Sequence, residues 1–176
     1  FPYQPEVQFR IAHTDDAILV HYKVKEASVR AVAAGDNGAV WEDACVEFFS
    51  IPAGDGIYYN VECNCAGILL IGAGAGRENR EHAPQEVMDK VQRWSSLGRQ
   101  SFEERVGECN WELALVIPYS AFFKHQITSL DGKTVRANFY KCGDKLQTPH
   151  FLSWNPIALE KPNFHCPEFF GTLNFE

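Results

Sequence analysis

The sequence has no run of lysine and arginine and no long apolar stretch, and these two absences bear on its partners. The formal net charge is -7, from 23 acidic and 16 basic residues. Nucleic acids are bound through a basic face that neutralises phosphates, and none is evident here. No apolar run reaches the roughly 20 residues that a membrane-spanning helix needs. We therefore expect no nucleic-acid partner and no insertion into a membrane.

Helical periodicity is also scarce, whereas alternation of apolar and polar residues is common. Such alternation is typical of half-buried strands. It occurs at 7–11, 17–25, 45–51, 57–65, 68–71, 111–117, 135–142 and 172–175, with turn-forming clusters between several of these segments. Only 85–94 and 118–123 have a helical pattern. The sequence thus predicts an all-β protein, an antiparallel two-sheet β-sandwich of jelly-roll type, with 1–176 as one domain and a monomer.

The cysteines and glycines give no diagnostic motif. Six cysteines are present, but a domain of this size does not need disulfides, so we expect buried free thiols. Cys63-x-Cys65 and His165-Cys166 lack zinc-site spacing, and we predict no metal ligands from them. The run 72–77 departs from the dinucleotide-binding spacing, and a proline follows it. The first residue is Phe1, which leaves a cleaved leader open, and we favour a secreted or periplasmic location over the cytoplasm.

Three segments concentrate side chains suited to sugar hydroxyls. In 59–65, alternation places Asn60, Glu62 and Asn64 on one face, where amides and a carboxylate offer donors and acceptors. Glu47 interrupts an apolar strand, so its carboxylate needs a partner or a ligand. The third segment, 136–144, and the tryptophans before and after these strands add further candidates. These are Asn138, Tyr140, Lys141, Trp41 and Trp154.

The order of these motifs resembles the family 9 carbohydrate-binding modules, and in particular the family 9-like proteins of Bacteroidetes. The resemblance rests on Trp-x-Asp-x-x-Val-Glu-Phe-Phe at 41–49, Tyr-Tyr-Asn-x-Glu-x-Asn at 58–64, Ala-Asn-Phe-Tyr-Lys at 137–141, Phe-Leu-Ser-Trp at 151–154 and Pro-Glu-Phe-Phe-Gly at 167–171. It covers nearly the whole chain. It implies a β-sandwich that grips a sugar between two tryptophan rings, helped by a glutamate, an arginine and an asparagine.

Carried onto this sequence, the resemblance assigns Trp41, Glu47 and Asn138 to that site, with Trp154 as the second tryptophan. The arginine has no direct match, and Arg77 and Arg80 are the nearest candidates. The family often holds a structural calcium ion, for which Asp15, Asp16, Asp43 and Asp55 are available near turns. We expect no other cofactor. The predicted ligand-binding set is therefore Trp41, Glu47, Asn60, Glu62, Asn64, Arg77, Asn138, Tyr140, Lys141 and Trp154, with no catalytic residue.

The predicted function is non-catalytic binding of a mono- or oligosaccharide in the service of glycan catabolism. Two alternatives stay open. A glycoside hydrolase would use Glu47 and Glu62 as its pair of carboxyl groups. A protein-interaction sandwich would have no sugar site, and a haem-binding variant would need an axial ligand that no histidine or Met88 supplies in a diagnostic setting.

Overall fold

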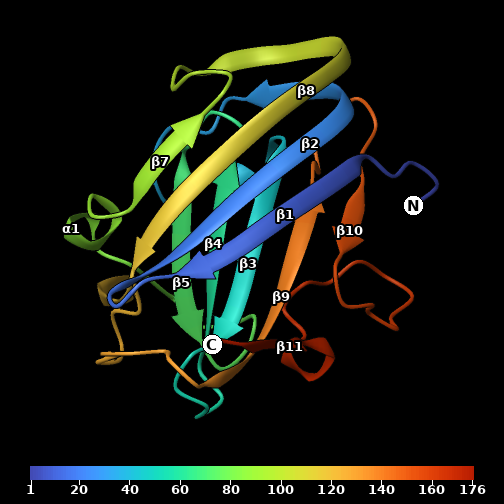
Figure 1. The fold of residues 1–176 in the computed structure, drawn as a ribbon. Coiled ribbons are helices and arrows are strands. Elements are labelled where there is room, and N and C mark those ends of the chain that lie inside the picture. Colours follow the sequence, from blue (N-terminus) through green and yellow to red (C-terminus); the bar gives the residue numbers. More distant parts are fainter.

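Two antiparallel sheets pack face to face in the computed structural model, which describes residues 1–176 (Figure 1). The smaller sheet has four strands in the order β1-β2-β8-β7. Their bounds are Glu6–His13 for β1, Ala17–Ala31 for β2, Phe102–Pro118 for β8 and Gln92–Ser95 for β7. In Figure 1 these blue and yellow strands cross in front of the second sheet. The predicted two-sheet β-sandwich is confirmed.

The larger sheet has seven strands, six of them in the order β10-β9-β3-β4-β5-β6. Their bounds are Phe151–Ser153 for β10, Thr134–Cys142 for β9, Cys45–Ile51 for β3, Tyr58–Asn64 for β4, Leu69–Gly74 for β5 and Glu81–His82 for β6. The seventh, β11 (Gly171–Asn174), also pairs with β9. It lies along the first half of β9, and β10 lies along the second half. One long strand thus anchors two segments from the irregular C-terminal region.

Alternation along the strands separates the two faces of the larger sheet. Val46 and Phe48 of β3, with Phe139 of β9, point toward the smaller sheet and belong to the main hydrophobic core. The residues between them point the other way, so Glu47 lies on the outer face of the larger sheet. Burial of the inner set drives the packing of the two sheets. The outer face is left for polar side chains and for the loops that cover it.

The helical predictions hold only in part. The segment 85–94 begins with a short helix, α1 (Gln85–Met88), but its last residues form β7, because their backbone pairs with β8. A bidentate pair between Arg93 and Asp36, with both N···O distances 2.7 Å, fixes this strand. Short 3-10 turns occur at η1 (Val40–Glu42), η2 (Tyr119–Ala121) and η3 (Pro167–Phe169). None of these helices has the length and apolar character to cross a membrane.

Candidate functional site

A cavity of about 370 Å³ opens on the outer face of the larger sheet. This volume lies in the range of roughly 300–1,000 Å³ that is usual for small-molecule sites. Its floor is formed by outward-facing side chains of β3, β4, β5 and β9. Its walls come from η1, the loop after β5, and the loop around residues 162–165. The lining residues are Trp41, Glu47, Asn60, Glu62, Leu70, Arg77, Arg80, His82, Cys142, Asp144, Phe151, Pro162, Asn163, Phe164 and His165.

Two glutamates form the centre of the floor. Glu47 of β3 is directly opposite Glu62 of β4 in the antiparallel register, and both side chains are buried. Directly opposed side chains on one face of a sheet have Cβ atoms about 4.5–5.5 Å apart. Neither carboxyl group is in an ion pair with a lysine, arginine or histidine. The floor therefore presents carboxyl oxygen atoms that are not held in an internal ion pair.

Burial controls the ionisation of this pair. It raises the pKa of Glu62 to about 7, although the amide of Asn60 and the charge of Arg80 act in the opposite direction. Burial, with Cys142 and Glu62 close by, raises the pKa of Glu47 well above its usual range. Near neutral pH the pair therefore retains a proton, and it can both donate and accept hydrogen bonds.

Arg80 reaches the floor through Asn60. The Arg80 guanidinium donates from Nε and Nη2 to Asn60 Oδ1, at 3.1 and 2.7 Å. Asn60 Nδ2 in turn donates to Glu62 Oε1 at 2.8 Å. The guanidinium also lies 3.9 Å from the centre of the Tyr58 ring and donates to two backbone carbonyls. This chain of contacts fixes the orientation of Glu62.

Aromatic side chains line two sides of the cavity. Trp41 lies in η1 with 39% of its surface exposed, so its ring is available to a ligand. Phe151 at the start of β10 and Phe164 contribute to another part of the wall, with ring centres 6.2 Å apart. Tyr140 supports this wall from behind, because its ring stacks on Phe164 at 4.2 Å and its hydroxyl donates to the Phe164 carbonyl.

His165 is held in the same wall in a neutral state. Its Nδ1 lies 2.7 Å from the Tyr58 hydroxyl. Burial, assisted by the charges of Arg80 and Arg77, lowers the pKa of His165 to about 4. At neutral pH the imidazole is therefore uncharged. Asp144 on the other side has a raised pKa because of burial and the nearby Glu42.

The structure brings five of the ten predicted ligand-binding residues to this cavity: Trp41, Glu47, Asn60, Glu62 and Arg77. Asn64 does not reach it, because its side chain is buried and bonded to Asp43 and to the backbone of Ala66 and Ile68. Asn138 is fully buried, and its amide is used to hold the backbone of Asn155 on both sides. Both asparagines serve loop structure.

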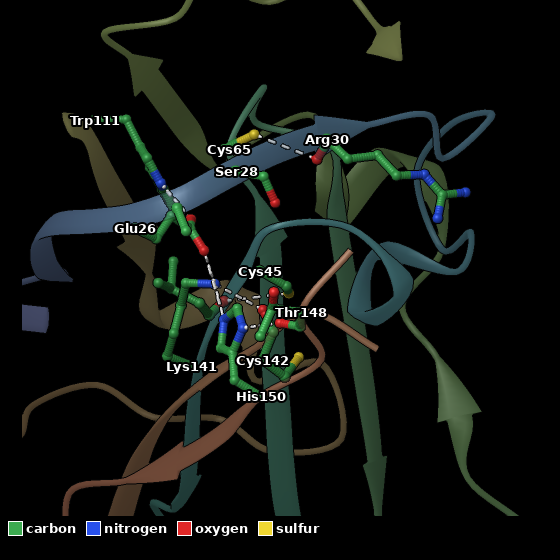
Figure 2. A network of polar contacts seen from close by, with 12 residues as sticks. Glu26, Ser28, Arg30, Cys45, Cys65, Trp111, Lys141, Cys142, Thr148 and His150 are labelled. Carbon is green, nitrogen blue, oxygen red and sulfur yellow. Dashed lines mark hydrogen bonds and ion pairs between the residues drawn. The ribbon is translucent and has the colours of Figure 1, made fainter. Parts of the chain in front are cut away.

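Trp154 and Lys141 also lie away from the cavity. Trp154 packs edge-on against Phe9 and Phe139 at the margin of the inter-sheet core, so no second tryptophan faces Trp41. Lys141 is on the inner face of β9 and is 1% exposed. Figure 2 shows it pointing to Glu26 and His150, with Nζ 2.9 Å from Glu26 Oε2 and 2.7 Å from His150 Nε2. Neither residue lines the cavity; both contribute to a smaller pocket of about 190 Å³, and a ligand-binding role for them stays a prediction.

Several lining residues were not predicted from the sequence as ligand-binding residues. Arg80, named from the resemblance only as an alternative to Arg77, contacts the floor residue Asn60. Cys142 and Asp144 come shortly after the β9 motif at 137–141. Phe151, Phe164 and His165 come from the Pro- and aromatic-rich region after residue 149. That composition is typical of a loop packed by its own side chains, and it is the one signal that could have pointed to this wall.

The aspartates expected for calcium do not converge. Asp43 is fully buried and accepts from the backbone N–H groups of Val32 and Ala33. Asp55 pairs with His125, at 2.9 Å. Asp16 accepts from the nearby Thr14 hydroxyl. Calcium requires six to eight clustered oxygens, so these residues do not fit such a site.

We expect the Glu62→Gln variant to gain stability relative to the wild type as pH rises. The folded-state pKa of Glu62, about 7, lies above the ordinary value of 4.5. The stability that its protonated form contributes is present below about pH 4.5 and is lost as pH rises through 7. The neutral amide has no such loss. The difference in unfolding free energy should grow by about 2–3 kcal/mol between about pH 5 and pH 8.

Urea unfolding at a series of pH values measures this difference. Glu108→Gln is the matched control, because the Glu108 side chain is 66% exposed. The control should follow the wild-type curve throughout. Parallel curves for Glu62→Gln and the wild type would show that burial does not shift this carboxyl group.

Comparison with known proteins identifies the family of the chain. A search of curated proteins gives no match. A solved protein from Bacteroides uniformis, proposed to bind carbohydrate, is 72% identical with a TM-score of 0.97, over 99% of this chain and 80% of that one. Family 9 carbohydrate-binding modules from Caldicellulosiruptor kristjanssonii, solved with glucose and with cellotriose, share the fold at 11% identity and a TM-score of 0.62. They cover all of this chain, which spans 79% and 77% of theirs. The model of carbohydrate-binding family 9 matches residues 1–175, so the chain belongs to that family.

Proposed function

We propose that the cavity on the outer face of the larger sheet binds a saccharide without catalysing its reaction. The observation that carries this proposal is the exposed ring of Trp41 beside the opposed carboxyl groups of Glu47 and Glu62, in one cavity. A pyranose has apolar C–H faces that pack on an aromatic ring, and hydroxyls that exchange hydrogen bonds with carboxyl groups. The glucose and cellotriose bound by the distant family members support this ligand class.

Each part of the cavity has a role in this proposal. Trp41 provides the stacking surface, and the proton that the glutamate pair retains lets the floor act as donor and acceptor. Arg77 is exposed at the rim and makes no hydrogen bond within the chain, so its guanidinium is available to ligand hydroxyls. Asn60 and Arg80 hold Glu62 in position. The biological role we propose is to hold a glycan for a catabolic enzyme.

Calorimetric titration with glucose, cellotriose and a panel of other hexoses and pentoses tests the proposal. We expect dissociation constants from roughly micromolar to millimolar, which correspond to about 4–8 kcal/mol.

The opposed glutamates also require a test of hydrolysis, because paired carboxyl groups are the usual catalytic groups of glycoside hydrolases. We expect no release of reducing ends from any oligosaccharide that binds. If products form and Glu62→Gln abolishes them while binding persists, the protein is an enzyme. If no sugar in the panel gives a heat of binding, the result would instead favour a protein-interaction role.

We expect Gly72→Ala to weaken sugar binding while the fold is preserved. Gly72 of β5 is directly opposite Asn60, and a Cβ there would lie 2.5 Å from Asn60 Oδ1. The Asn60 amide would have to move away from both Arg80 and Glu62. We expect affinity to fall by roughly 10-fold, equivalent to about 1.4 kcal/mol, measured by the same titration.

Gly76→Ala is the matched control for this prediction. Gly76 lies in the loop of Arg80, and no atom lies within 4 Å of a Cβ built on it. Its carbonyl still accepts from Arg80. The control variant should bind sugar as the wild type does. Equal affinity of both variants and the wild type would exclude a positioning role for Asn60.

A further inference from the structure

Two thiols and a carboxyl group meet at the edge of the cavity floor. Cys45 and Glu47 are two residues apart on β3, so they share its outer face. Cys142 of β9 is directly opposite Cys45 in the register. The two sulfur atoms and a Glu47 carboxylate oxygen lie within 4.8 Å of one another, and Cys142 Sγ is 3.1 Å from Glu47 Oε1. Figure 2 shows Cys45 and Cys142 beside the contacts of Lys141 and His150.

These three groups have few other partners. All three side chains are buried, with exposed fractions of 0% for Cys45, 1% for Cys142 and 2% for Glu47. Apart from its contact with Glu47, the Cys142 thiol contacts the Trp41 carbonyl at 3.5 Å and the Cys45 thiol beside it. The Cys45 thiol contacts Cys142 and, at 3.7 Å, the Val46 carbonyl. A buried carboxyl group whose hydrogen bond comes from a thiol is poorly satisfied.

The arrangement matches the first coordination shell of zinc. Zinc takes thiolate sulfur at about 2.3 Å and carboxylate oxygen at about 2.0–2.2 Å, in tetrahedral geometry. Neighbouring donor atoms in such a shell are roughly 3.5–3.8 Å apart, a spacing that small side-chain movements would reach here. An apolar cluster of Val40, Leu70 and Ala33 surrounds the two cysteines and would shield the ion. Hard cations such as calcium prefer oxygen ligands, and two thiols disfavour them.

We propose that Cys45, Glu47 and Cys142 form a binding site for Zn²⁺ or a similar thiophilic divalent cation. Binding would release the two thiol protons and form two metal–sulfur bonds and one metal–oxygen bond. Glu47 and Cys142 line the cavity, so the fourth coordination position faces it and is open to water or to a ligand oxygen. Three protein ligands with one open position are the pattern of zinc sites that bind water or a substrate.

Zinc binding does not require the proposed sugar function, but the two sites share Glu47. Glu47 belongs to both, so a metal that engages its carboxylate changes what the floor offers to a saccharide. Zinc and sugar affinities must then alter each other by the same factor. Titration of sugar with and without bound zinc measures that factor, whereas zinc binding itself needs no sugar.

The test uses the reduced, metal-free protein and the metal alone. Zn²⁺ affinity is measured by competition with a chromophoric chelator. In a second experiment Co²⁺ is bound in place of Zn²⁺, and its visible and thiolate charge-transfer bands report tetrahedral sulfur ligation. We expect one ion per chain and at least a 100-fold loss of affinity in Cys142→Ala. Cys63→Ala is the matched control, because Cys63 is equally buried but points to the opposite face of the same sheet. It should bind within about 3-fold of the wild type.

Two results would overturn the site. One is reduced protein that takes up no zinc. The other is zinc affinity that Cys142→Ala leaves unchanged. Should Cys142→Ala fail to fold, Glu47→Gln supplies the second variant, with the same expected loss of metal and weakened cobalt bands.

Discussion

Replacing Trp41 with alanine is expected to reduce sugar affinity by roughly 30-fold, or about 2 kcal/mol. The ring is the largest apolar surface that the cavity offers, and it is 39% exposed before any ligand arrives. A pyranose face that packs on it removes apolar area from water on both partners. No second tryptophan lines the cavity, and Phe151 and Phe164 are less exposed than Trp41. For a millimolar ligand, the loss would abolish measurable binding.

Trp94→Ala is the control for this experiment. Trp94 lies on β7 of the smaller sheet and is 54% exposed, so its truncation removes a comparable surface ring far from the cavity. Calorimetry should give wild-type affinity for this variant. The two proteins should also melt close to the wild type, because partly exposed rings contribute little to the core. An equal loss of sugar affinity in Trp41→Ala and Trp94→Ala would mean that the sugar does not bind specifically at Trp41.

The second large effect is expected in the buried network between the sheets. Lys141→Met should lower the free energy of unfolding by about 3–5 kcal/mol, because it leaves the Glu26 carboxylate buried without its countercharge. Glu26 Oε1 also accepts from the Trp111 indole N–H at 2.6 Å. In the wild type His150 is not a second countercharge, because burial and the lysine charge lower the pKa of His150 to about 4. Its neutral Nε2 accepts from Lys141, while Nδ1–H donates to the Thr148 carbonyl.

The double variant Glu26→Gln/Lys141→Met distinguishes a lost charge pair from lost packing. Removing both charges avoids the uncompensated carboxylate, so the double variant should be more stable than Lys141→Met alone. Lys23→Met serves as a surface control, because its ion pair with Glu112 is exposed and worth about 0–1 kcal/mol. Urea unfolding measures all four proteins. Sugar affinity should be unchanged in Lys141→Met under conditions where it stays folded, whereas a ligand-binding role for Lys141 requires a loss.

The sandwich could be predicted from the sequence because alternation along a strand reports directly which face is buried. This worked for β3 and β4, where Glu47, Asn60 and Glu62 fall on the outer face. It failed for 92–94, where Trp94 is the single apolar residue and no period can be read. It also missed the first half of β8, because that half is largely polar and exposed and its order comes from backbone pairing with β2. Pairing of that kind leaves no trace in hydrophobic periodicity.

Only the part of the site that lies on a single strand could be predicted. Alternation along β4 is enough to place Asn60 and Glu62 on the same face. The position of the wall at 162–165 depends on how a loop without periodicity folds back onto the sheet. Lys141 is the opposite case, a residue that was predicted from a motif but does not line the cavity. It follows Tyr140 in the motif that resembles a binding strand. Alternation along β9 points its side chain to the interior, where Glu26 of β2 stabilises its charge. Likewise, Cys45 and Cys142 meet only because β3 and β9 are neighbours.

The most direct test of the saccharide site is a heteronuclear NMR titration that follows the four tryptophan indole N–H signals, assigned by Trp→Phe variants. Trp41 lines the cavity, Trp111 is buried in the core, and Trp94 and Trp154 are exposed elsewhere. Addition of glucose or cellotriose should shift the Trp41 signal in a saturable manner and leave the other three unchanged. A saturable shift of Trp154 or Trp94 with Trp41 unmoved, or no shift with any sugar, would contradict the site described above.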